Sequence, residues 1–157
     1  MALHQPEQVY RWLERDDLVG RCAFETRDDP AYAIEVDTPE TAVRVVRDGE
    51  DEPVCVCGEA DVDPALLVSF GDDDRRQTVL GQLSSVVAGS DGSVTFRDAG
   101  GERCGLRDLR RVAFEQRVYP GALTRHRLLT AVQGIASDVG YLETVLANFQ
   151  RFDAPSR

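Results

Sequence analysis

Four cysteines are the side chains of this chain best suited to metal or redox chemistry. Cys55 and Cys57 are separated by one residue, and residues i and i+2 of a strand point to the same face. With Cys22 and Cys104 they could supply four thiolates, but structural zinc sites usually pair cysteines two to four residues apart on turns. A metal site and a redox pair are alternatives, and the spacing favours buried, reduced thiols without a bound metal or cofactor.

The other chemically capable side chains are two histidines and one acidic run. His4 lies near the chain start, and His126 is expected in the first turn of a helix, exposed to solvent. A nucleophilic pair of Cys22 and His126 is an alternative that no neighbouring residue supports. The run Asp72-Asp73-Asp74 could attract a divalent cation, but it also suits a helix start, where the dipole favours carboxylates. We therefore predict no catalytic residues and expect that the protein is not an enzyme.

The charge of the chain excludes some classes of partner. Its 157 residues include 28 acidic and 18 basic side chains, giving a formal charge of −10, and all the basic ones are arginine. Nucleic acids and anionic membrane surfaces bind basic footprints, so we expect neither as a partner. An acidic, lysine-free surface suits a salt-rich cytoplasm, which predicts a halophilic source. A GC-rich genome would explain the arginines but explains the acidic excess less well.

The charge is also divided unevenly along the chain. Residues 1–74 have a net charge of −14 and residues 75–157 a net charge of +4. Pairing between the two halves is the favoured interpretation, and an anionic partner on the later half is the alternative. The arginines that would meet such a partner are Arg103, Arg107, Arg110 and Arg111.

Hydrophobic periodicity predicts one α+β domain over residues 1–152 and a frayed tail over residues 153–157. A helix is expected over about residues 6–17, followed by four short alternating segments between residues 22 and 57. Two more such segments follow later in the chain, which makes about six strands. Their short connections favour an antiparallel sheet. No signal peptide or membrane span is expected, so we predict a cytoplasmic protein with reduced thiols.

Two further helices are predicted in the middle of the chain. Asp63-Pro64 is typical of a helix start, and Asp72 is expected to begin a second helix. The apolar face of that second helix consists of Val79, Leu80, Leu83, Val86 and Val87. Between the last two strands, residues 98–110 are predicted to form a loop that is rich in glycine and arginine.

The last helix has the most regular pattern, and Thr124 is its expected N-cap. Its apolar positions repeat every seven residues: Leu128, Val132, Ile135, Val139, Leu142, Leu146 and Phe149. A helix of this length spans about 40 Å at 1.5 Å per residue, which exceeds the width of a small sheet. We therefore predict a homodimer through the far half of this helix. The alternative is that the domain's own sheet covers the whole stripe. The predicted interface residues are Val139, Leu142, Leu146 and Phe149.

The order of elements and several short motifs resemble a family of small, mostly archaeal proteins without a characterised function. In the first helix, Trp12-Leu13 and Leu18-Val19 match that family, and Arg75-Arg76 matches a later helix start. The segment before the last helix keeps Tyr119, Leu123 and Thr124, while Pro120 and Ala122 depart from the pattern. The resemblance implies a fold similar to that of type III secretion chaperones and the formation of dimers.

These observations predict a non-enzymatic, protein-binding or chaperone-like module that forms a homodimer and binds another polypeptide. The Tyr119–Leu123 junction is expected to fix the direction of the last helix. The competing hypothesis is a small-molecule- or metal-binding protein, which could be an enzyme, centred on Cys55 and Cys57.

Overall fold

A computed structural model describes residues 6–68 and 73–153 of the chain. The helices are α1 (Pro6–Glu14), α2 (Pro64–Val68), α3 (Asp73–Gly89), the short 3-10 turns η2 (Leu106–Asp108) and η3 (Pro120–Ala122), and α4 (Arg125–Asp153). The strands are β1 (Cys22–Asp28), β2 (Ala31–Asp37), β3 (Ala42–Arg47), β4 (Val54–Asp61), β5 (Ser93–Arg97) and β6 (Arg111–Val118). This confirms the predicted α+β class, with a long helix at the C-terminal end.

The strands form a six-stranded sheet in the order β1-β2-β3-β4-β6-β5, and every neighbouring pair is antiparallel. The prediction of antiparallel pairing from short connections is therefore confirmed. β4 lies inside the sheet, as its apolar sequence predicted, with Val56 opposite Val45 on one side and Gln116 on the other. The register of the β1 edge shifts between Phe24 and Thr26, which marks a bulge.

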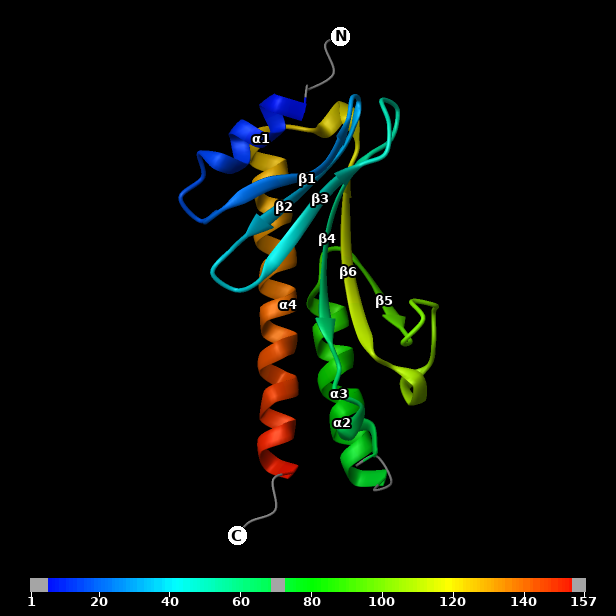
Figure 1. Ribbon diagram of the computed structural model, residues 1–157. Coiled ribbons are helices and arrows are strands. Elements are labelled where there is room, and N and C mark those ends of the chain that lie inside the picture. Colours follow the sequence, from blue (N-terminus) through cyan, green and yellow to red (C-terminus); the bar gives the residue numbers. More distant parts are fainter. Residues whose placement is uncertain (1–5, 69–72, 154–157) are drawn as a thin grey trace.

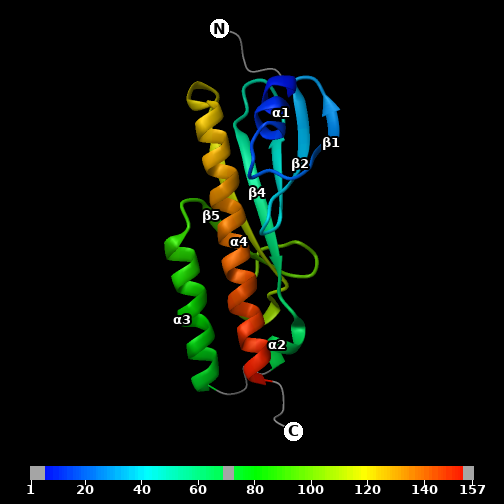
Figure 2. The same cartoon turned by 90° about the vertical axis from the view of Figure 1, so that its left-hand side faces the viewer.

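The helices gather on one face of the sheet (Figures 1 and 2). α4 crosses β4, β6 and β3, and α1 lies over β1 and β2 at the upper end of α4 in Figure 1. α3 runs beside the lower half of α4, beyond the main body of the sheet. Where α4 crosses β4, Gly58 brings the two backbones close: a Cβ there would lie 3.0 Å from methyl carbons of Ile135 and Val139. The core therefore lies between the sheet and these helices.

The opposite face of the sheet is polar. Strand alternation places Glu35, Arg44, Cys57 and Glu115 on that face, in one row across neighbouring strands. Arg44 also donates to the Glu25 carboxylate at 2.7 Å. Among the described residues, none of the helices covers this row (Figure 1).

The predicted helix starts are confirmed where the structure describes them. Asp63 accepts the Ala65 amide at 2.9 Å, and Thr124 accepts the Arg127 amide at 3.1 Å, so both cap their helices. α1 ends at Glu14, three residues earlier than expected, and α4 continues to Asp153. Asp72 lies outside the described residues. In the described part of the chain, no helix has the length and apolar character that crossing a bilayer demands.

The apolar seam of α4 is covered within one chain. Val139 and Leu142 are 0% exposed, Leu146 is 7% exposed, and Phe149 is partly buried against the same core. That core includes Leu66 of α2 and Leu83 and Val86 of α3, which lie past the sheet. The expectation that the far half of α4 lacks cover was wrong, because the sequence argument counted only the sheet as cover. Self-association is a separate matter and stays a prediction.

Candidate functional site

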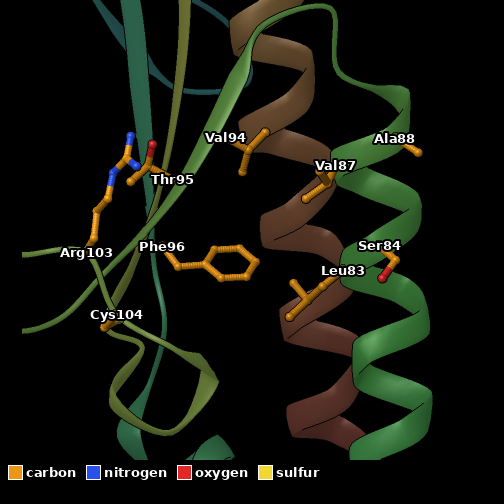
Figure 3. A pocket seen from close by; sticks show the side chains of 9 residues that line it. All are labelled: Leu83, Ser84, Val87, Ala88, Val94, Thr95, Phe96, Arg103 and Cys104. Carbon is orange, nitrogen blue, oxygen red and sulfur yellow. The ribbon is translucent and has the colours of Figure 1, made fainter.

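An apolar groove lies between α3 and β5, at the edge of the sheet. Because α3 rests on α4, a hollow of about 560 Å³ separates α3 from β5. In Figure 3, Val94 and Phe96 of β5 point toward Leu83 and Val87 of α3 across this space. Val87 is 41% exposed, whereas Leu83 is buried at the base. The groove thus presents accessible apolar side chains that are continuous with the core.

The hollow continues around the edge of β5, where Thr95, Arg103 and Cys104 complete its lining. After β5 the chain turns back at Gly101, whose φ is +83°, and runs along the outer edge of the strand. There the Cys104 amide donates to the Phe96 carbonyl at 3.1 Å. This return segment, residues 98–104, therefore covers the C-terminal half of the edge.

The N-terminal half of the β5 edge is open. Because backbone groups alternate in direction along a strand, the outward Phe96 carbonyl places the polar groups of Val94 on the outer side as well. No strand among the described residues pairs with Val94 on that side. An extended peptide could add there as a further strand, with alternate side chains entering the groove.

The connection between α3 and β5 fixes the upper end of the groove. The Ser90 hydroxyl donates to the Asp138 carboxylate of α4 at 2.8 Å. The Ser90 Oγ also accepts a hydrogen bond from the Gly92 amide at 3.2 Å. Burial raises the pKa of Asp138, and the Ser90 hydrogen bond opposes that shift. A Cβ at Gly92 would lie 2.3 Å from the Glu115 carbonyl oxygen, so only glycine fits this close approach to β6.

Arg103 lines the groove, and Arg107 and Arg110 follow it in the chain without being part of the lining. Arg103 and Arg107 are exposed and Arg110 is half-buried, and none of the three forms an ion pair with another described residue. Arg111 instead lies 3.6 Å from Glu59 and 3.4 Å from Asp61. The predicted pairing between the acidic and basic halves thus holds for Arg111, and the other three stay available to an anionic partner.

The cysteines do not come together as a set. Cys55 and Cys57 share the polar face of β4, as predicted, while Cys22 begins β1 at the far edge and Cys104 lies on the return segment. The described residues contain no cluster of three or more His, Cys, Asp or Glu side chains that could hold a metal ion. Burial raises the pKa of Cys57 to about 11 and raises that of Cys55. Both thiols are therefore protonated at neutral pH, which disfavours metal binding and nucleophilic chemistry.

The remaining candidates from the sequence add no site. His126 is exposed in the first turn of α4, as expected, whereas His4 lies outside the described residues. The side chains of Asp73 and Asp74, like all of Asp72, also lie outside them.

Sequence reasoning missed the groove because it assigned Val86 and Val87 to one buried face. Neighbouring helical residues lie about 100° apart, so a helix that contacts the core along a narrow stripe can bury one of them and expose the other. The structure buries Val86 and exposes Val87. This pair, together with the partly buried Phe96 on an edge strand, was the available indication of an unfilled apolar surface.

Comparison with known proteins supports the fold alone. No family model matches the chain, and no curated protein matches its sequence. Among solved structures, an uncharacterised protein from Methanothermobacter thermautotrophicus is similar, with a TM-score of 0.66 over 93% of this chain and 96% of that chain. The two sequences are 12% identical. The architecture is therefore shared with an archaeal protein to which no activity is attached.

Proposed function

We propose that this chain is a non-enzymatic, protein-binding module that receives an extended segment of another polypeptide in the groove between α3 and β5. The observation that carries the proposal is the open edge at Val94 beside exposed apolar side chains of α3. Backbone pairing would supply affinity, and alternate side chains in the groove would supply selectivity. A chaperone-like role in a salt-rich cytoplasm agrees with the resemblance noted from the sequence and with the charge of −10.

The chemistry of the groove defines the partner segment. Its apolar lining calls for Val, Ile, Leu or Phe at alternate positions, and Arg103 calls for Asp or Glu at the end that meets the return segment. A second copy of this chain fits less well, since each copy carries −10 and the two would repel each other at low salt. The predicted homodimer can be tested separately by sedimentation at high salt.

The proposal can be tested by selecting displayed peptides on the intact chain and measuring the affinity of the winners. We expect alternating apolar residues with an acidic residue at one end of the segment. The Val87→Asp variant should weaken binding by about tenfold or more, since it puts a charge among apolar side chains. Ser85→Asp places the same charge on an exposed position of α3 outside the groove and should leave affinity unchanged.

Backbone pairing requires its own control. N-methylation of every second amide removes the hydrogen-bond donors along one side of an extended peptide. Of the two alternating methylation patterns, the one that removes the donors facing β5 should therefore abolish binding. Failure to select any binder, or equal loss with Val87→Asp and Ser85→Asp, would contradict the proposal. Stoichiometric zinc in protein purified without chelators, lost in Cys55→Ser, would favour the competing metal-binding hypothesis.

A further inference from the structure

A second hollow, of about 540 Å³, lies where α1 meets the start of α4, at the end of the molecule away from α3 (Figure 1). It is lined by Glu7, Gln8, Arg11, Trp12, Arg15 and Arg125. Three of these six side chains are guanidinium groups. Two of them, Arg11 and Arg15, belong to residues 1–74, whose net charge is −14.

Local geometry forces two of these charges together. The Arg15 amide donates to the Arg11 carbonyl at 3.1 Å, so the helical spacing of α1 continues to Arg15 and places both side chains on one face. Like charges at this spacing repel each other. Arg125, the first residue of α4, adds a third charge from a separate element.

The three arginines of the hollow have no ion-pair partner among the described residues. Glu7 is the acidic residue of the lining, and its carboxylate is already paired with Arg27. Arg11, Arg15 and Arg125 are exposed, and none of them forms an ion pair or side-chain hydrogen bond with another described residue. An anion in the hollow would supply the missing partner.

We infer that this hollow binds a compound with two linked phosphate groups. Guanidinium groups donate two parallel hydrogen bonds to phosphate oxygens, so three of them match an anion with several such oxygens. Linked phosphates carry about three negative charges near neutral pH, which balances the three arginines. Trp12 provides an aromatic surface in the same hollow, on which the ring of a nucleoside diphosphate could stack.

The single tryptophan of the chain makes the binding directly measurable. Intrinsic fluorescence excited at the indole band reports on Trp12 alone, so titration with pyrophosphate should give a saturable change. The titration should be made at the lowest salt at which circular dichroism shows a folded chain, because salt screens exposed charges. ADP tests the nucleotide source: tighter binding with stronger quenching than pyrophosphate indicates ring stacking, and equal affinity indicates the free diphosphate.

Charge-neutral variants test the assignment. Arg11→Gln, Arg15→Gln and Arg125→Gln should each weaken pyrophosphate binding by about tenfold, the effect of losing a hydrogen bond to a charged group. Arg117→Gln removes an exposed arginine of β6 that is already paired with Glu115 at 2.7 Å, and it should leave the affinity unchanged. The inference is overturned by a dissociation constant weaker than ~1 mM, by orthophosphate binding as tightly as pyrophosphate, or by equal weakening in Arg117→Gln.

Discussion

Replacing Gly58 with alanine tests the closest contact between the sheet and α4. The new Cβ would lie 3.0 Å from Ile135 Cγ2 and 3.0 Å from Val139 Cγ2. Carbon atoms pack best at about 3.5–4.0 Å, so α4 and β4 must separate by about 0.5–1 Å at this point. Both neighbours are β-branched and have few alternative rotamers, so the strain cannot be relieved by one side chain alone.

The magnitude follows from two opposing effects. Overpacking of a filled core costs about 1–3 kcal/mol, and the loss of glycine flexibility in the unfolded chain returns about 0.4–1 kcal/mol. Gly58→Ala should therefore lower the free energy of unfolding by about 1–2 kcal/mol, measured by urea denaturation. At this chain length the melting temperature should fall by about 2–4 °C for each kcal/mol.

A matched substitution separates crowding from backbone effects. Gly81 lies in α3 and is exposed, and a Cβ added there would meet nothing within 4 Å, so Gly81→Ala should raise stability by about 0.5–1 kcal/mol. Combining Gly58→Ala with Val139→Ala removes one of the two crowded methyl groups, and the pair should cost less than the sum of the single changes. If Gly58→Ala is as stable as the parent while Gly81→Ala behaves as expected, the close packing of α4 on β4 is refuted.

Two further predictions concern the α4 seam and the thiols. Leu142→Ala should lower the free energy of unfolding by about 2–5 kcal/mol at every protein concentration, because Leu142 is 0% exposed within one chain. A stability loss that appears only at concentrations where the parent chain is dimeric would show that the seam is an interface. Cys57, whose pKa is about 11 instead of the ordinary 9.0, should react with iodoacetamide only as pH approaches 11, followed by peptide mass spectrometry. Because the folded chain holds the Cys57 proton more tightly than the unfolded chain does, the stability that this thiol contributes is present below pH 9 and is lost as pH rises through about 11. Labelling of Cys57 at half its maximal rate near pH 9 would contradict the burial of the thiol.

Local patterns in the sequence predicted the elements well, because they depend on neighbouring residues. The alternating segments became strands, and the caps at Asp63 and Thr124 formed as expected. The heptad repeat of α4 predicted a homodimer seam, which stays a prediction, whereas residues of α2 and α3 of the same chain belong to the core that covers it. The repeat could not distinguish the two, since α3 of the same chain and a second copy would leave the same pattern in the sequence.

Features that depend on the spacing between elements could not be predicted in this way. The groove exists because α3 packs against α4 and leaves a space beside β5. The hydrophobic periodicity of a helix does not specify which neighbouring element it packs against. Arg125 joins Arg11 and Arg15 because α1 and the start of α4 meet across more than 100 residues of sequence. The net charge summed over half the chain hid this cluster, because the many acidic residues outweigh the two arginines. A count of charges along one face of the first helix would have found Arg11 and Arg15.

The return segment that follows β5 also limits how far the sheet can grow. Unprotected sheet edges recruit further copies without end and lead to fibrils. Here residues 98–104 occupy part of one edge, and the bulge between Phe24 and Thr26 distorts the other. On the proposal made above, one short guest strand would pair at Val94, while these two features limit the addition of further strands.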